Sequence, residues 1–195
     1  MRSDLPQGPE SPPTDELRSA ELSLGVLHRV VKGIARSDLD RRTPCSEYDI
    51  AGLTDHLLDS ITGLGGLAGA ELPERDREDT VERQIILAAR PALDAWHRRG
   101  LEGTVTVGDR EMPAKVVAGI LSIEFLVHGW DYARAMDLEL PAPDSLAEYV
   151  LALAEKNITP AGRAAVGFDD PVELADDAAS PLHRLLAFTG RRTDC

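Results

Sequence analysis

Apolar residues recur every three to four positions along most of the chain, which predicts a mainly α-helical protein. The segments with this period cover about residues 14–36, 49–70, 80–99, 113–136, 144–156 and 180–188. The first four are long, and short or medium links join them. This arrangement is typical of a four-helix bundle, in which metal and cofactor sites form from side chains that face the core.

Two segments have a different pattern. Residues 103–107 alternate polar and apolar side chains, and Gly108 with Asp109 is a turn signal, so we expect a small β-hairpin here. Val172 to Leu174 is rich in strand-forming residues and is predicted as a further short strand in a C-terminal extension.

The ends and the length of the chain bound its organisation. Residues 1–13 contain four prolines among polar residues and lack the apolar stretch of a signal peptide, so we expect a disordered tail. Residues 14–195 suit a single domain with one core. No apolar run approaches the roughly 20 residues of a membrane span, and we expect a cytoplasmic protein without a membrane partner.

The charge of the chain narrows the function classes. Its net charge is -13, and so acidic a surface repels phosphate backbones, so we expect no nucleic-acid partner.

The two cysteines, Cys45 and Cys195, are too few for a disulfide scaffold and fit a reducing compartment. Cys45 precedes the second predicted helix, and we interpret it as a buried thiol.

The fourth predicted helix carries polar residues on its apolar face. Glu124 and His128 are four residues apart and therefore share one face, and Asp131 follows three residues later. A buried carboxylate or imidazole is costly unless it is paired or coordinates a metal. The second helix has the same anomaly, because His56 lies between Leu53 and Leu57.

Three of these four polar residues can form one metal site if the two helix faces meet. Two imidazoles and one carboxylate, from His56, Glu124 and His128, bind Zn(II) well and leave a position open for water or substrate. The same set suits Fe(II). A neighbouring carboxylate, Asp131 first, with Asp55 or Asp59 as alternatives, can orient a ligating imidazole. Spacing alone also allows a structural interpretation, in which each histidine is a satisfied core residue.

Four short motifs carry a resemblance to a known family. They are residues 43–45 (TPC), 49–57 (DIAGLTDHL), 124–135 (EFLVHGWDYARA) and 181–191 (PLHRLLAFTGR). On these motifs the chain resembles the DinB-like superfamily, and more closely the short actinobacterial members of the mycothiol-dependent maleylpyruvate isomerase family. Two features depart from that family. Ser46, Glu47 and Tyr48 stand where members usually have Pro-Gly-Trp, and the chain is too short for the isomerase's second, C-terminal domain.

The resemblance implies a DinB-like bundle with a divalent metal held by His56, Glu124 and His128. It also implies mycothiol as the thiol co-substrate of a transferase or isomerase that acts on a small electrophilic metabolite. Zn(II) is the first choice of metal, with Ni(II) or Fe(II) as alternatives. Arg134 is a candidate contact for an anionic ligand or a partner of Asp131, and a homodimer is an open alternative to a monomer.

Two other functions fit the same residues. The first is a hydrolase that needs no thiol and uses metal-activated water. The second is a non-catalytic protein in which the metal positions a ligand or stabilises the fold.

We interpret Arg191 and Arg192 as charges that complement the C-terminal end of the last helix.

Overall fold

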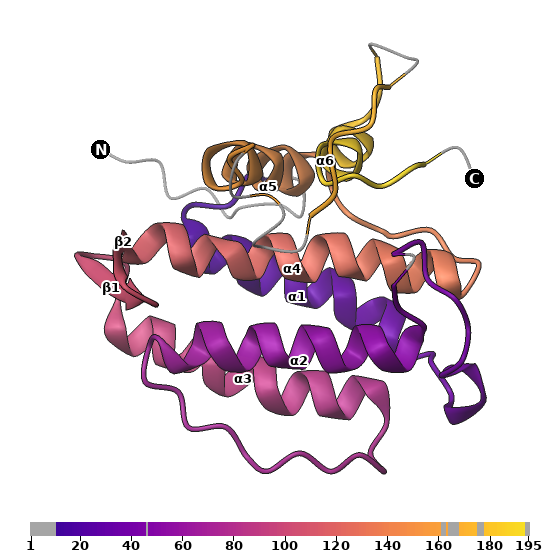
Figure 1. Ribbon diagram of the computed structural model, residues 1–195, viewed down its shortest axis with the longest axis horizontal. Helices are drawn as coiled ribbons and strands as arrows, with labels where there is room; N and C mark the ends of the chain where they lie inside the picture. The colour runs from indigo at the N-terminus through magenta and orange to yellow at the C-terminus, as the bar shows by residue number, and fades with distance from the viewer. Residues whose placement is uncertain (1–10, 46, 161–162, 164–167, 175–177, 194–195) are drawn as a thin grey trace.

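The computed structural model describes residues 11–45, 47–160, 163, 168–174 and 178–193. In this part of the chain the protein is mainly α-helical with one two-stranded antiparallel sheet, as the sequence predicts (Figure 1). The elements are α1 (Glu16–Val31), η1 (Arg36–Asp38), α2 (Ile50–Gly66), α3 (Val81–Arg99), β1 (Thr104–Val107), β2 (Arg110–Pro113), α4 (Ala114–Ala135), α5 (Asp144–Asn157) and α6 (Pro181–Phe188). Residues 1–10 of the predicted tail, and Ser46, lie outside the described residues.

Side-chain caps determine where several helices begin. Asp15, Asp49, Thr80 and Ser180 each accept a hydrogen bond from the backbone N–H three residues further on. Each cap satisfies a donor that the first helical turn leaves without a partner. The first helix ends at Val31 rather than near residue 36, and the short 3₁₀ helix η1 follows it.

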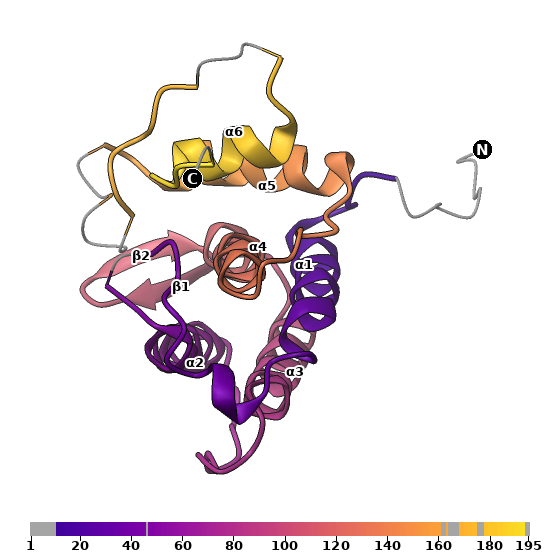
Figure 2. The same cartoon turned by 90° about the vertical axis from the view of Figure 1, so that its right-hand side faces the viewer.

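Helices α1 to α4 enclose the main core, and the other two helices cover one side of it. Contacts join α1 to α4, α2 to α3, α1 to α3 and α2 to α4. Figure 2 shows α2 and α4 nearly end-on, with α5 and α6 in a layer above α4. The backbone of Leu27 in α1 lies close to Gly129 in α4, where an added Cβ would be 3.6 Å from the Leu27 Cα.

Helix α4 is the central helix of the protein. It is long and apolar enough to cross a membrane, but 89% of its most apolar window is buried inside the protein. A core helix of a soluble protein has this burial. Because α4 is packed on several sides, three of its charged or titratable residues, Glu124, His128 and Asp131, are buried.

The predicted hairpin is present and the predicted late strand is not. Strands β1 and β2 pair with Val105 opposite Met112, and the turn includes Gly108 at φ 64°. Residues 172–174 are not a strand. Instead, the Val172 N–H donates to the carbonyl of Ala187 in α6, and no strand of the described residues pairs with this segment.

Candidate metal centre

The structure brings together the three residues predicted as metal ligands. His56 comes from α2, and Glu124 and His128 come from α4. One ligand atom of each lies within 4.8 Å of the others. The Glu124 Oε2 atom is 3.8 Å from the His56 Nε2 atom and 3.5 Å from the His128 Nε2 atom. This arrangement can hold a metal ion.

Two of the distances between these atoms are close to those at a metal site. At tetrahedral zinc, with bonds of about 2.0–2.2 Å, ligand atoms lie roughly 3.3–3.6 Å apart. The two distances to Glu124 are close to that value and too long for good hydrogen bonds. Glu124 Oε2 is buried and lacks a hydrogen-bond partner among the described residues. A cation between the three side chains would satisfy that oxygen.

A buried chain of charged groups holds His128 in place. The His128 Nδ1 atom is 2.9 Å from Asp131 Oδ2, so Nδ1–H donates to the carboxylate and Nε2 faces Glu124. Asp131 is fully buried and accepts two hydrogen bonds from Arg191, at 3.0 Å from Nη2 and 3.4 Å from Nε. A carboxylate behind a ligating imidazole fixes its orientation and raises its basicity. Asp131 is therefore the carboxylate that contacts the His128 imidazole.

Electrostatics keep this cluster charged despite its burial. Burial opposes the charged form of His128, but the hydrogen bond to Asp131 and the negative charges of Asp131 and Glu124 outweigh it and raise the pKa of His128 to about 9. Burial alone would raise the pKa of Glu124, but His128 and His56 lower it overall. In the same way Arg191 and His128 overcome burial and lower the pKa of Asp131. Both carboxylates are therefore ionised and ready to ligate or to orient a ligand.

His56 occupies a more open position than His128. Its side chain is 29% exposed, and its ring stacks on Tyr48 with centroids 5.3 Å apart. Burial, followed by repulsion from His128, lowers the pKa of His56, so its imidazole is neutral at pH 7. A neutral imidazole is the form that binds a metal.

The loop before α2 presents Tyr48 to His56. Thr43 Oγ1 donates to the carbonyls of Cys45 and Tyr48, and Arg42 forms a β-bridge with Asp49. Tyr132 lies one helical turn after His128 on α4. Its hydroxyl shares a buried hydrogen bond of 2.9 Å with the hydroxyl of Thr54, and this bond joins α2 to α4. These contacts set the register between the two helices that supply the ligands.

Two residues near the centre were missed or misjudged from the sequence. Arg191 donates to the Thr189 carbonyl at the end of α6, but it is buried and its ionic partner is Asp131, so its interpretation as a dipole charge was incomplete. Nothing local signals this pairing across 60 residues. Cys45 is half-buried rather than buried, and burial raises the pKa of its thiol. Cys45 does not belong to the ligand group in the described part of the chain.

The remaining candidates lie around the centre. Asp55 pairs with Arg75 at 2.6 Å and with Arg77 at 3.3 Å, so it does not orient a ligand. Asp131 pairs with Arg191. Arg134 is exposed and lines an open pocket of about 510 Å³ at the C-terminal end of α4.

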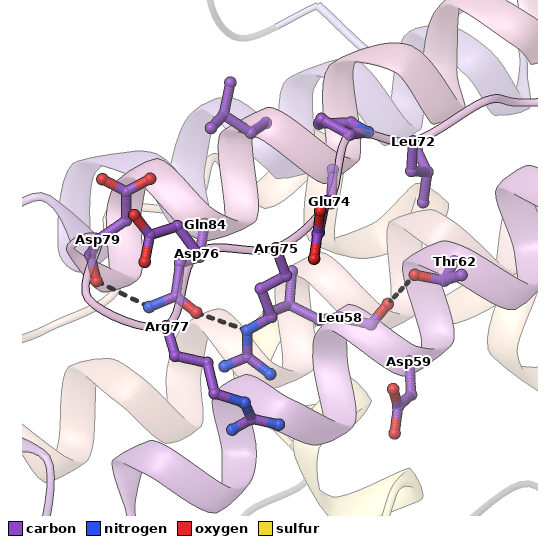
Figure 3. Close-up of a pocket in the computed structure, with 13 residues that line it drawn as sticks. Leu58, Asp59, Thr62, Leu72, Glu74, Arg75, Asp76, Arg77, Asp79 and Gln84 are labelled. Atoms are coloured by element: carbon purple, nitrogen blue, oxygen red, sulfur yellow. Dashed lines mark hydrogen bonds between the residues drawn. The ribbon is translucent and has the colours of Figure 1, made fainter.

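A second pocket of about 260 Å³ lies between α2 and the segment before α3 (Figure 3). The polar side chains that line it bond to one another: Arg75 Nε donates to Gln84 Oε1 at 2.7 Å, and Gln84 Nε2 donates to the Asp79 carbonyl at 2.7 Å. Asp59 lines this pocket on the α2 side. Because Arg75 and Gln84 already make hydrogen bonds within this pocket, we do not assign the pocket to the candidate metal centre.

Comparison with known proteins gives relatives but no function. Two uncharacterized proteins of Mycobacterium tuberculosis, MT0763 of strain CDC 1551 / Oshkosh and Rv0738 of strain ATCC 25618 / H37Rv, are similar to the chain. Each is 26% identical over 183 residues, which covers 91% of this chain and 98% of the relative. No protein-family model matches the chain, and no solved structure matches it.

Proposed function

We propose that this protein is a metal-dependent enzyme that uses a low-molecular-weight thiol, mycothiol in its host, to act on a small electrophilic metabolite. The single observation that carries the proposal is the convergence of His56, Glu124 and His128 around Glu124 Oε2, a buried atom with no hydrogen-bond partner in the described part of the chain. Three protein ligands leave coordination positions open, which a purely structural zinc site does not. The exposure of His56 gives a small molecule access to that side.

Each residue has a definite part in this proposal. His56, Glu124 and His128 hold the metal in a DinB-like four-helix bundle, and Zn(II) fits this donor set, with Ni(II) and Fe(II) as alternatives. Bound zinc supplies Lewis acidity that lowers the pKa of a thiol and favours its thiolate. Asp131 keeps the His128 Nδ1–H engaged, so that Nε2 stays directed at the metal position. Group transfer or isomerisation then depends on the electrophile that enters.

The choice of mycothiol comes from the sequence resemblance alone. A thiol-free hydrolase would use the same ligands, so thiol dependence is the property that separates the two functions.

The test combines metal analysis with turnover. Purified protein is expected to contain about one zinc per chain, His56→Ala to lose it, and His97→Ala to keep it, because His97 pairs with Glu21 on the surface. The zinc-loaded protein is then mixed with an aryl halide, with and without mycothiol. Thiol-dependent consumption of the halide supports the proposal. Full metal occupancy in His56→Ala overturns the site, and equal turnover without thiol overturns the thiol reaction.

A further inference from the structure

Three arginines from distant parts of the chain line the pocket at the C-terminal end of α4. Arg42 precedes α2, Arg134 lies at the end of α4, and Arg192 follows α6. All three side chains are exposed, and Trp130 forms part of the wall. The volume of about 510 Å³ is in the range of small-molecule sites.

The charge of this pocket contrasts with the rest of the protein. The chain has a net charge of -13, yet the described residues that line the pocket include three arginines and a single carboxylate, that of Asp169. A concave surface with one sign of charge concentrates ligands of the opposite sign. The planar fork of arginine matches the oxygens of carboxylate and phosphate groups.

Each wall of the pocket continues into the candidate metal centre. Trp130 and Arg134 flank Asp131 on α4, and Gly190 and Arg192 flank Arg191. Consecutive arginines therefore face opposite ways, since Arg191 is buried against Asp131 and Arg192 is exposed in the pocket. The loop with Arg42 is the one that presents Tyr48 to His56.

The C-terminal wall is held in a defined shape. Gly190 adopts φ 84°, and a Cβ at this position would be 2.5 Å from the Asp169 Cβ, so only glycine fits here. Arg163 is buried and donates from Nη1 to the carbonyls of Asp169 and Phe188, at 3.0 and 2.6 Å. A binding wall that is ordered before the ligand arrives loses less entropy on binding.

We propose that Arg42, Arg134 and Arg192 form an oxyanion subsite that holds a carboxylate or phosphate group of the substrate beside the metal centre. This inference rests on the proposed function and names the class of molecule that it takes: a small electrophile with an anionic group at one end. Trp130 supplies the apolar surface next to that group.

The test measures anion binding apart from catalysis. Calorimetry follows succinate and inorganic phosphate binding to the zinc-loaded protein at constant ionic strength with chloride as the background anion. The variant Arg134→Gln/Arg192→Gln is compared with Arg90→Gln/Arg98→Gln, which removes the same charge from exposed positions on α3. Succinate binding alone would indicate a carboxylate substrate, and phosphate binding alone a phosphorylated one.

We expect saturable binding of one anion, weakened about tenfold or more in the pocket variant and by no more than about twofold in the surface variant. Binding should persist in His56→Ala. If the wild type binds neither anion, or if both double variants bind alike, the subsite is wrong. Loss in His56→Ala alone would place the anion on the metal, which also overturns the subsite.

The two proposals fail in different ways. Zinc content and thiol-dependent turnover of an uncharged halide test the metal enzyme and do not require the arginines. If these persist while anion binding is absent, only the subsite fails. If the double pocket variant does not fold, as judged by circular dichroism, Arg192→Gln alone replaces it, because this exposed side chain carries no part of the core.

Discussion

The two halves of the candidate metal centre differ in how they are held. On α4, the side chains of Glu124 and His128 are 7% and 4% exposed, and the buried Asp131–Arg191 pair lies behind His128. On α2, His56 is 29% exposed, and its ring contacts include the stacked Tyr48. The α4 half is preorganised by charge, whereas the α2 half rests on packing at the surface.

This difference indicates that the two halves have separate roles. Burying the charges on α4 removes their hydration, which lowers the stability of the folded state unless every charge keeps its partner. The open half contributes one ligand and leaves room for a molecule to approach. Variants that disturb one half and spare the other therefore test the comparison directly.

The largest expected effect is in the buried half. Asp131→Ala leaves Arg191 as a buried charge without its carboxylate and should lower the free energy of unfolding of the metal-free protein by about 3–5 kcal/mol. Urea unfolding followed by circular dichroism measures it. Asp59→Ala on α2 is the control and should change stability by less than about 1 kcal/mol. A comparable small loss for Asp131→Ala would show that the charged chain is not structural.

The second prediction compares zinc affinity with the stability of the metal-free protein for one ligand from each half. His56→Ala should weaken zinc binding more than the about 10–100-fold that loss of a supporting partner costs, yet leave the metal-free protein within about 1 kcal/mol of the wild type. His128→Ala should reduce both properties, because it removes the hydrogen-bond donor of Asp131 and the positive charge beside Glu124. Zinc competition with a chromogenic chelator, alongside urea unfolding, measures both. Equal destabilisation by the two variants would contradict the separate roles of the two halves.

The third effect is on pH. The pKa of His128 is about 9 in the folded, metal-free protein and about 6.5 unfolded, so its contribution to stability is complete below pH 6.5 and is lost as the pH rises through 9. Zinc must displace that proton, so its affinity should rise about tenfold per pH unit from pH 7 to 9 and then level off. Chelator competition across this range measures the slope. A flat profile would mean that His128 is already neutral.

The smallest effect is expected at the open half. Tyr48→Leu removes the ring that stacks on His56 and should weaken zinc binding by about two- to fivefold, the equivalent of a modest aromatic contact. Tyr149→Leu on α5 gives a matched control away from the centre. A loss as large as that of His56→Ala would show that Tyr48 holds the ligand as firmly as Asp131 holds His128.

Local patterns predicted much of this molecule. The helical period and the caps located the helices to within a few residues, except that α1 ends five residues before the expected boundary. The strand expected at Val172–Leu174 was wrong, because strand propensity describes a residue's preference and not whether a neighbouring strand exists. In the same way, the pattern along a helix shows that a charged residue lies on the apolar face but does not show which distant residue pairs with it.

What the sequence by itself determined was which residues violate the apolar faces of the helices. Glu124, His128 and Asp131 share a face because four- and three-residue steps bring side chains together on any α-helix. Only the tertiary structure decided that His56 meets them, that Arg191 is the partner of Asp131, and that three arginines border one pocket. These contacts span tens of residues, and helical periodicity carries no information about which faces of distant segments will meet.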